Sequence, residues 1–199
     1  MFDFSAFFAQ YGNLFLQGTV DTTCVATILA YVIGIPLGIL LVVTSPNGLR
    51  PNRIVSTIVG WIVNIGRSVP FIILLVALIP FTRFIVGTSL GVPGAVVPLV
   101  VTAAPFAARM VEQSLEETDS GLVEAAQSFG ASTWQIVWKV YLKETLPSLV
   151  RGAAITFVTL FGYSAMAGTV GAGGLGDIAI RYGYQRFQTD VMIFAVLLC

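Results

Sequence analysis

The stretch TTCVATILAYVIGIPLGILLVV, residues 22–43, decides the class of this fold. It carries no charged residue over its whole length, and a helix needs about 20 mostly apolar residues to cross the hydrocarbon core of a bilayer. The run closes at Ser45, Pro46, Asn47 and Gly48, which all favour turns. We therefore predict a membrane-spanning helix over residues 22–43.

The composition of the whole chain is that of an integral membrane protein. The 199 residues are 56% hydrophobic and 10% charged, with a mean hydropathy of +0.90, whereas soluble domains carry about 25% charged residues. Ten basic residues balance ten acidic ones, so the charge does not indicate a nucleic-acid surface. The chain has no histidine and only two cysteines, Cys24 and Cys199, which excludes an imidazole base and a Cys-only zinc site.

The remaining spans follow from the same search for long uncharged stretches. Residues 54–81 form one predicted span that Arg67 interrupts, and residues 92–110 and 152–170 form two more. Residues 191–199 are apolar but too few to cross a bilayer alone. We expect an all-α membrane protein with five transmembrane helices, the fifth cut short at Cys199.

Basic residues in the short loops predict the orientation. If the N-terminus lies outside, the cytoplasmic side holds Arg50, Arg53, Arg109, Lys139, Lys143 and Arg151, and the outside holds Arg83, Arg181 and Arg186. This excess of basic residues on the cytoplasmic side favours an N-terminus outside the cell. Residues 1–199 then form a single transmembrane domain, in which residues 112–147 are a cytoplasmic insert.

The insert is predicted to be two short helices with a sharp turn between them. Ser120 can cap the first helix, with Glu124 in its first turn, and Gly130 ends it. Ser132 and Gln135 have the spacing of a capping box that starts the second helix, which runs toward Pro147. The small residues at the turn leave room for another protein, although a plain intracellular loop fits the same spacing.

The insert resembles the EAA loop of ABC-transporter permease subunits. The shared residues are Glu124-Ala125-Ala126, then Gly130-Ala131 after three residues, then Val140-Tyr141-Leu142. In that family the loop docks into a groove on the ATP-binding subunit. The resemblance therefore assigns coupling to the ATPase to Glu124, Ala125, Ala126, Gly130, Ala131 and Ser132.

Other segments are similar to the methionine-uptake members of this family. They include residues 64–75, 79–83, 104–106, 109–112, 162–168 and 171–176, and the resemblance covers most of residues 20–190. It implies the type I ABC importer permease fold in a bacterial cytoplasmic (inner) membrane. The implied partners are a second copy of the chain in a homodimer, two ATP-binding subunits and an extracytoplasmic substrate-binding protein. ATP and Mg would bind to the partner ATPase, and no cofactor to this chain.

Two groups of side chains are candidates for the substrate pathway. Arg67 stands inside an apolar run, where an unpaired charge is costly, so it faces either a polar pathway or, at a late helix start, the membrane interface. Asn64 shares its helix face and could hydrogen-bond with it, and Ser68 follows it. Tyr163, Ser164 and Met166 lie in the middle of residues 152–170 and could line a pathway for a thioether amino acid or serve helix packing.

Two glycine and lysine patterns bear on nucleotide binding. Residues 171–176 match G-x-G-x-x-G, but a membrane span precedes them instead of a strand, so we expect a glycine-rich turn. No G-x-x-x-x-G-K-[ST] occurs, so the chain has no P-loop for hydrolysing ATP.

The sequence therefore predicts a non-enzymatic permease that translocates methionine by ATP-driven alternating access. Two rival functions remain. One is an ABC permease for another amino acid, because no residue specifies methionine from first principles. The other is an ion-driven secondary transporter in which Arg67 pairs with a moving acid, although the predicted spans lack Asp and Glu.

Overall fold

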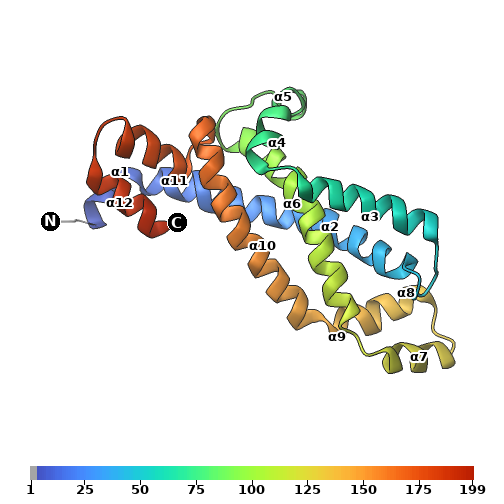
Figure 1. The fold of residues 1–199 in the computed structure, drawn as a ribbon. Helices are drawn as coiled ribbons and strands as arrows, with labels where there is room; N and C mark the ends of the chain where they lie inside the picture. Colours follow the sequence, from blue (N-terminus) through green and yellow to red (C-terminus); the bar gives the residue numbers. More distant parts are fainter. Residues whose placement is uncertain (1–3) are drawn as a thin grey trace. The chain divides into compact units, whose positions relative to one another are not determined.

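The computed structural model describes residues 4–199, and within this range the regular secondary structure is entirely helical (Figure 1). Wide π-type turns join several helices into longer ones. The helices are α1 (Phe4–Phe15), α2 (Thr22–Thr44), α3 (Arg53–Ser68), α4 (Phe71–Ala77), α5 (Ile79–Val86), α6 (Gly91–Glu116), α7 (Ser120–Ser128), α8 (Thr133–Ile136), α9 (Leu142–Glu144), α10 (Leu146–Ala167), α11 (Gly174–Asp177) and α12 (Thr189–Leu198).

Three helical stretches are long and apolar enough to cross a membrane: Phe7–Thr44, Gly91–Glu116 and Leu146–Ala172. The broken pair α3 and α4 makes a fourth if it counts as one span, and α12 is a shorter apolar helix. The first span is longer than predicted, because a π-helical segment, Leu16–Asp21, joins α1 to α2. Asp21, the residue just before the predicted span, lies inside this continuous helix with its side chain exposed.

The prediction of one helix over residues 54–81 is wrong. α3 ends at Ser68 and α4 begins at Phe71, with Val69 and Pro70 outside both helices. Proline has no N–H to donate and disfavours the helical conformation of the residue before it. The break therefore follows from Pro70.

The ends of the insert also differ from the prediction. α6 continues six residues past Met110 to Glu116, so residues 112–116 belong to this helix and not to a loop. α10 begins at Leu146, six residues before Gly152, and Pro147 lies in its first turn, where a missing N–H costs nothing. The part of the insert outside the two long helices is therefore residues 117–145.

The chain divides into two compact units. Unit 1 contains residues 1–28, 69–103 and 157–199, and unit 2 contains residues 29–68 and 104–156.

Unit 1 is held together by tight backbone packing and by an aromatic cluster. Phe7, Tyr11, Ile178 and Phe194 are buried together, with the rings of Phe7 and Phe194 5.2 Å apart. The glycine-rich turn predicted at residues 171–176 is present, and its packing is tight, because Gly176 lies directly against the carbonyl group of Ala165.

Unit 2 is built on a close approach of α2 to α6. A Cβ on Gly34 would lie 2.7 Å from the Cβ of Ala107, and one on Gly38 would lie 2.7 Å from the carbonyl oxygen of Ala108. The G-x-x-x-G pair of α2 is therefore a helix contact that requires glycine. Next to it lies the buried cluster Val42, Val111, Leu115, Ile136, Val137 and Tyr141, which anchors the insert to both helices.

Candidate functional site

The first helix of the insert, α7, starts one residue earlier than predicted. Asp119 is the N-cap, and its Oδ1 accepts a hydrogen bond of 2.7 Å from the backbone N–H of Gly121. Ser120 is therefore the first helical residue and not the cap, and Glu124 lies beyond the first turn. Asp and Ser are both good N-cap residues, so the sequence alone does not decide which of these two neighbours caps the helix.

The turn after α7 needs glycine at residue 130. Gly130 has φ +76°, and the N–H groups of Phe129, Gly130 and Ala131 return to carbonyls of the last turn of α7. This positive φ is the helix stop that the sequence predicted. A Cβ on Gly130 would have no atom within 4 Å, so the turn faces open space.

The second helix of the insert begins with the predicted capping box. The Oγ of Ser132 accepts the N–H of Gln135 at 3.3 Å, and the Oε1 of Gln135 accepts the N–H of Ser132 at 2.8 Å. Figure 1 shows α7 and α8 as two short helices joined by this tight turn. A π-helical segment, Val137–Tyr141, and α9 continue the second helix to Glu144, just before Pro147.

The six predicted coupling residues surround one exposed tip. Glu124, Ala125, Gly130 and Ser132 are exposed, whereas Ala126 and Ala131 are half-buried against the cluster around Tyr141. Burial raises the pKa of the Tyr141 phenol above its ordinary value. The sequence missed Phe129, which is 91% exposed at the tip. An apolar ring this exposed, beside small residues, suits contact with another protein.

A polar hollow of about 560 Å³ lies beside α7. Its walls include Glu116 at the end of α6, Glu124 and Gln127 on α7, and the turn at Asn47 and Gly48. Two carboxylates at its edge favour a basic group as occupant.

A polar cluster joins α3 to α6 inside the membrane helices. Arg109 donates from Nη1 to Glu112 at 2.6 Å and from Nη2 to the Oδ1 of Asn64 at 2.8 Å. The predicted bond between Asn64 and Arg67 is therefore replaced by one to Arg109, which the sequence had placed at the cytoplasmic side. The candidate span Gly91–Glu116 therefore includes Glu112, which the predicted span ending at Met110 left out, and its carboxylate is paired with Arg109.

Arg67 lies in the last turn of α3 and not at its start. The helix begins at Arg53, so Arg67 is about 21 Å further along the axis at 1.5 Å per residue. Its guanidinium carbon lies 5.9 Å from the centre of the Phe106 ring, and the side chain is exposed. The late helix start that would have made Arg67 an interface anchor is wrong. Ser68 turns back and donates to the carbonyl of Asn64 at 2.8 Å.

The other predicted pathway residues lie in unit 1. Tyr163 stacks on Phe71 with ring centres 4.8 Å apart, and Ser164 is 1% exposed and donates to the carbonyl of Phe161. Met166 is 49% exposed. Ser164 thus serves local packing, and Met166 is the member of this group with an open side chain. Among residues 4–199, no group of three or more Cys, Asp or Glu side chains could hold a metal ion.

Comparison with known proteins gives a consistent result. The family described as "Binding-protein-dependent transport system inner membrane component" matches residues 34–199. The probable D-methionine transport system permease protein MetI of Vibrio cholerae is 49% identical over 194 residues, 96% of this chain and 86% of that protein. The D-methionine transport system permease protein MetI of Yersinia pestis is 55% identical over 150 residues, 75% of this chain and 69% of that protein.

Solved structures agree in fold. A chain of the MetNI methionine ABC transporter in an inward-facing conformation matches with a TM-score of 0.90 and 53% identity, over 92% of this chain and 85% of that one. An amino acid ABC transporter crystallised with histidines matches with a TM-score of 0.70 over 100% of this chain and 91% of that one. Its identity is 20%, so this second likeness bears on the fold alone.

Proposed function

We infer that this chain, which belongs to the family of binding-protein-dependent transport system inner membrane components, is the permease subunit that carries methionine through an ABC importer. The observation that carries the inference is the 53% identity to a chain of the MetNI methionine ABC transporter, at a TM-score of 0.90. The apolar helices of both units and the exposed tip of the insert fit a membrane subunit that is driven by a separate ATP-hydrolysing subunit.

ATP and Mg bind to the partner subunit in this proposal, and this chain holds no cofactor. Its sequence has no P-loop, so the energy must enter through a contact. The tip at Glu124 and Gly130 is the contact, and the cluster around Tyr141 transmits its movement to α2 and α6. Alternating access then requires two states of the permease that the ATPase contacts differently.

The assembly we propose is a homodimer in a bacterial inner membrane. Two ATP-binding subunits dock at the insert between α6 and α10, residues 117–145, and a substrate-binding protein delivers methionine from outside. Residues 1–199 act as one permease domain.

Co-purification and uptake test the function together. The ATPase should co-purify in equal amount with the permease, and proteoliposomes of the complex should accumulate labelled methionine only with ATP. Methionine accumulation that does not depend on ATP, and that an ionophore abolishes, would favour the ion-driven secondary transporter. If the complex takes up another amino acid in preference to methionine, an ABC permease of different specificity is favoured.

The outside N-terminus gives a separate prediction. In a chain with Cys24 and Cys199 replaced, a cysteine at Gln185 should react with an impermeant thiol reagent added to intact cells, because the orientation places it outside. A cysteine at Ser120 should react only after the cells are opened. Labelling of Ser120→Cys in intact cells would reverse the orientation.

A further inference from the structure

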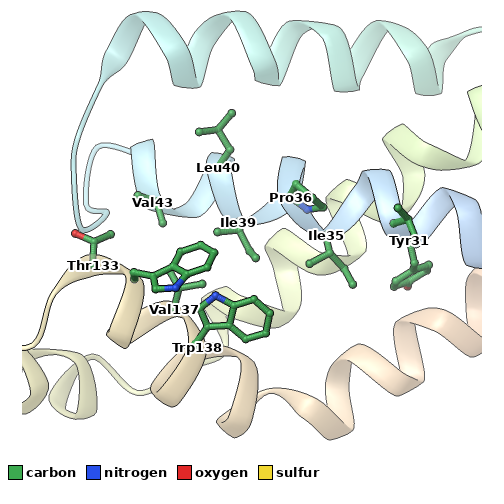
Figure 2. Close-up of a pocket in the computed structure, with 11 residues that line it drawn as sticks. Tyr31, Ile35, Pro36, Ile39, Leu40, Val43, Thr133, Val137 and Trp138 are labelled. Carbon is green, nitrogen blue, oxygen red and sulfur yellow. The ribbon is translucent and has the colours of Figure 1, made fainter.

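An apolar groove runs along the second half of α2, opposite α8 and the π-helical segment that follows it (Figure 2). Its volume is about 470 Å³, within the range of about 300–1,000 Å³ typical of ligand pockets. Figure 2 shows Ile39 directed across this space toward the indole of Trp138. The lining residues are Tyr31, Val32, Ile35, Pro36, Ile39, Leu40, Val43, Thr133, Trp134, Val137 and Trp138.

The groove lies where a membrane span ends. The span Phe7–Thr44 contributes its last third, and the chain leaves it in the turn after Thr44. Trp134 and Trp138 face this end with ring centres 5.4 Å apart, and both are exposed. Tryptophan is enriched at the level of lipid headgroups, so the apolar groove opens to the acyl chains just beneath that level.

One end of the groove carries positive charge. Thr133, which lines the groove, accepts a hydrogen bond of 3.1 Å from the Nε of Arg50, whose side chain is exposed. Nε is only one of the guanidinium's donors, and its Nη groups suit a phosphate. The two stretches that line the groove, residues 31–43 and 133–138, contain no charged residue, so Arg50 is the charge bonded directly to its wall.

We propose that this groove binds one anionic phospholipid. An acyl chain lies along Ile35 and Ile39 beside the two indoles, and the phosphate binds Arg50 next to Thr133. The apolar lining accounts for the acyl chain, and the positive charge of Arg50 selects an anionic headgroup over a zwitterionic one. Basic pockets between membrane helices bind acidic lipid headgroups in this manner.

Native mass spectrometry of the purified permease–ATPase complex tests the site. The complex is mixed with phosphatidylglycerol or phosphatidylethanolamine of the same acyl chains, and the bound lipid is measured. The wild type should retain phosphatidylglycerol several-fold better. Arg50→Gln should lower phosphatidylglycerol binding about fivefold and leave phosphatidylethanolamine unchanged, because one basic residue near the membrane surface contributes this much.

Three further variants separate the site from its alternatives. Arg50→Lys should keep most of the preference, and Arg53→Gln, the matched control outside the groove, should keep all of it. Ile39→Trp fills the groove and should lower the binding of both lipids, and ATPase co-purification checks that it folds. Equal binding of the two lipids, or equal losses in Arg50→Gln and Arg53→Gln, would overturn the proposal. A disulfide between copies carrying Ile35→Cys, in a chain without Cys24 and Cys199, would assign the groove to a second copy and overturn it too.

Discussion

Tryptophan in place of Gly130 should lower ATP-driven uptake at least tenfold while the chain still inserts into the membrane. A Cβ at Gly130 would have no atom within 4 Å, so the indole starts into open space and adds bulk to the tip that carries Glu124 and Ser132. A loss of only about 1.4 kcal/mol in docking already corresponds to a tenfold weaker contact. Uptake in proteoliposomes and co-purification of the ATPase measure the two effects.

Gly87 provides a matched control for this experiment. It ends α5 with φ +79°, nearly the same as Gly130, and a Cβ on it would also have no atom within 4 Å. The backbone strain of a tryptophan, about 1–2 kcal/mol for a left-handed residue, is therefore the same at both positions. Gly87→Trp should transport normally. If both variants lose uptake equally, strain and not the docking surface explains the loss at Gly130.

The turn of the insert was predictable because its signals are local. A capping box needs only two residues three positions apart, and both hydrogen bonds between Ser132 and Gln135 formed as predicted. The cap of α7 was missed for an equally local reason, because Asp119 and Ser120 are adjacent and equally suited to the position. The exposure of Phe129 has no local signal, since it depends on the surfaces that the rest of the chain leaves uncovered.

The long apolar helices were predictable, but five spans were expected where the described residues hold three, or four if α3 and α4 count as one. Hydropathy found the long helices, but it does not register Pro70, which breaks residues 54–81 although every neighbour is apolar. The search for uncharged stretches also began the first span at Thr22, whereas the helix continues back through Asp21, whose side chain is exposed.

The contact between Asn64 and Arg109 could not be predicted from the sequence. Asn64 and Arg109 are 45 residues apart, and they meet because α3 and α6 approach closely at Gly66, where a Cβ would lie 2.6 Å from the Cγ of Pro105. The i,i+3 spacing of Arg109 and Glu112 was a visible signal of a helical ion pair. It was overlooked because the predicted span ended at Met110.

The cluster also separates two arginines that the sequence could not rank. Arg109 is neutralised by Glu112 and held by Asn64, so its charge is already committed. Arg67 faces the ring of Phe106, which stabilises a cation but does not neutralise it. The exposed guanidinium of Arg67 is therefore the better candidate to meet the carboxylate of an amino acid in transit.

Arg67→Gln should accordingly lower methionine uptake roughly tenfold or more, because a hydrogen bond to a charged group contributes about 1.5–3 kcal/mol. Glutamine keeps a donor and most of the length, so the complex should still assemble with its ATPase. Arg53→Gln, at the exposed start of the same helix, is the matched control and should transport like the wild type. ATP hydrolysis by the complex should remain measurable in both variants, since the insert is unchanged. Normal uptake in Arg67→Gln would show that the charge of Arg67 has no part in transport. The substrate pathway would then have to be sought elsewhere, beginning at the exposed side chain of Met166.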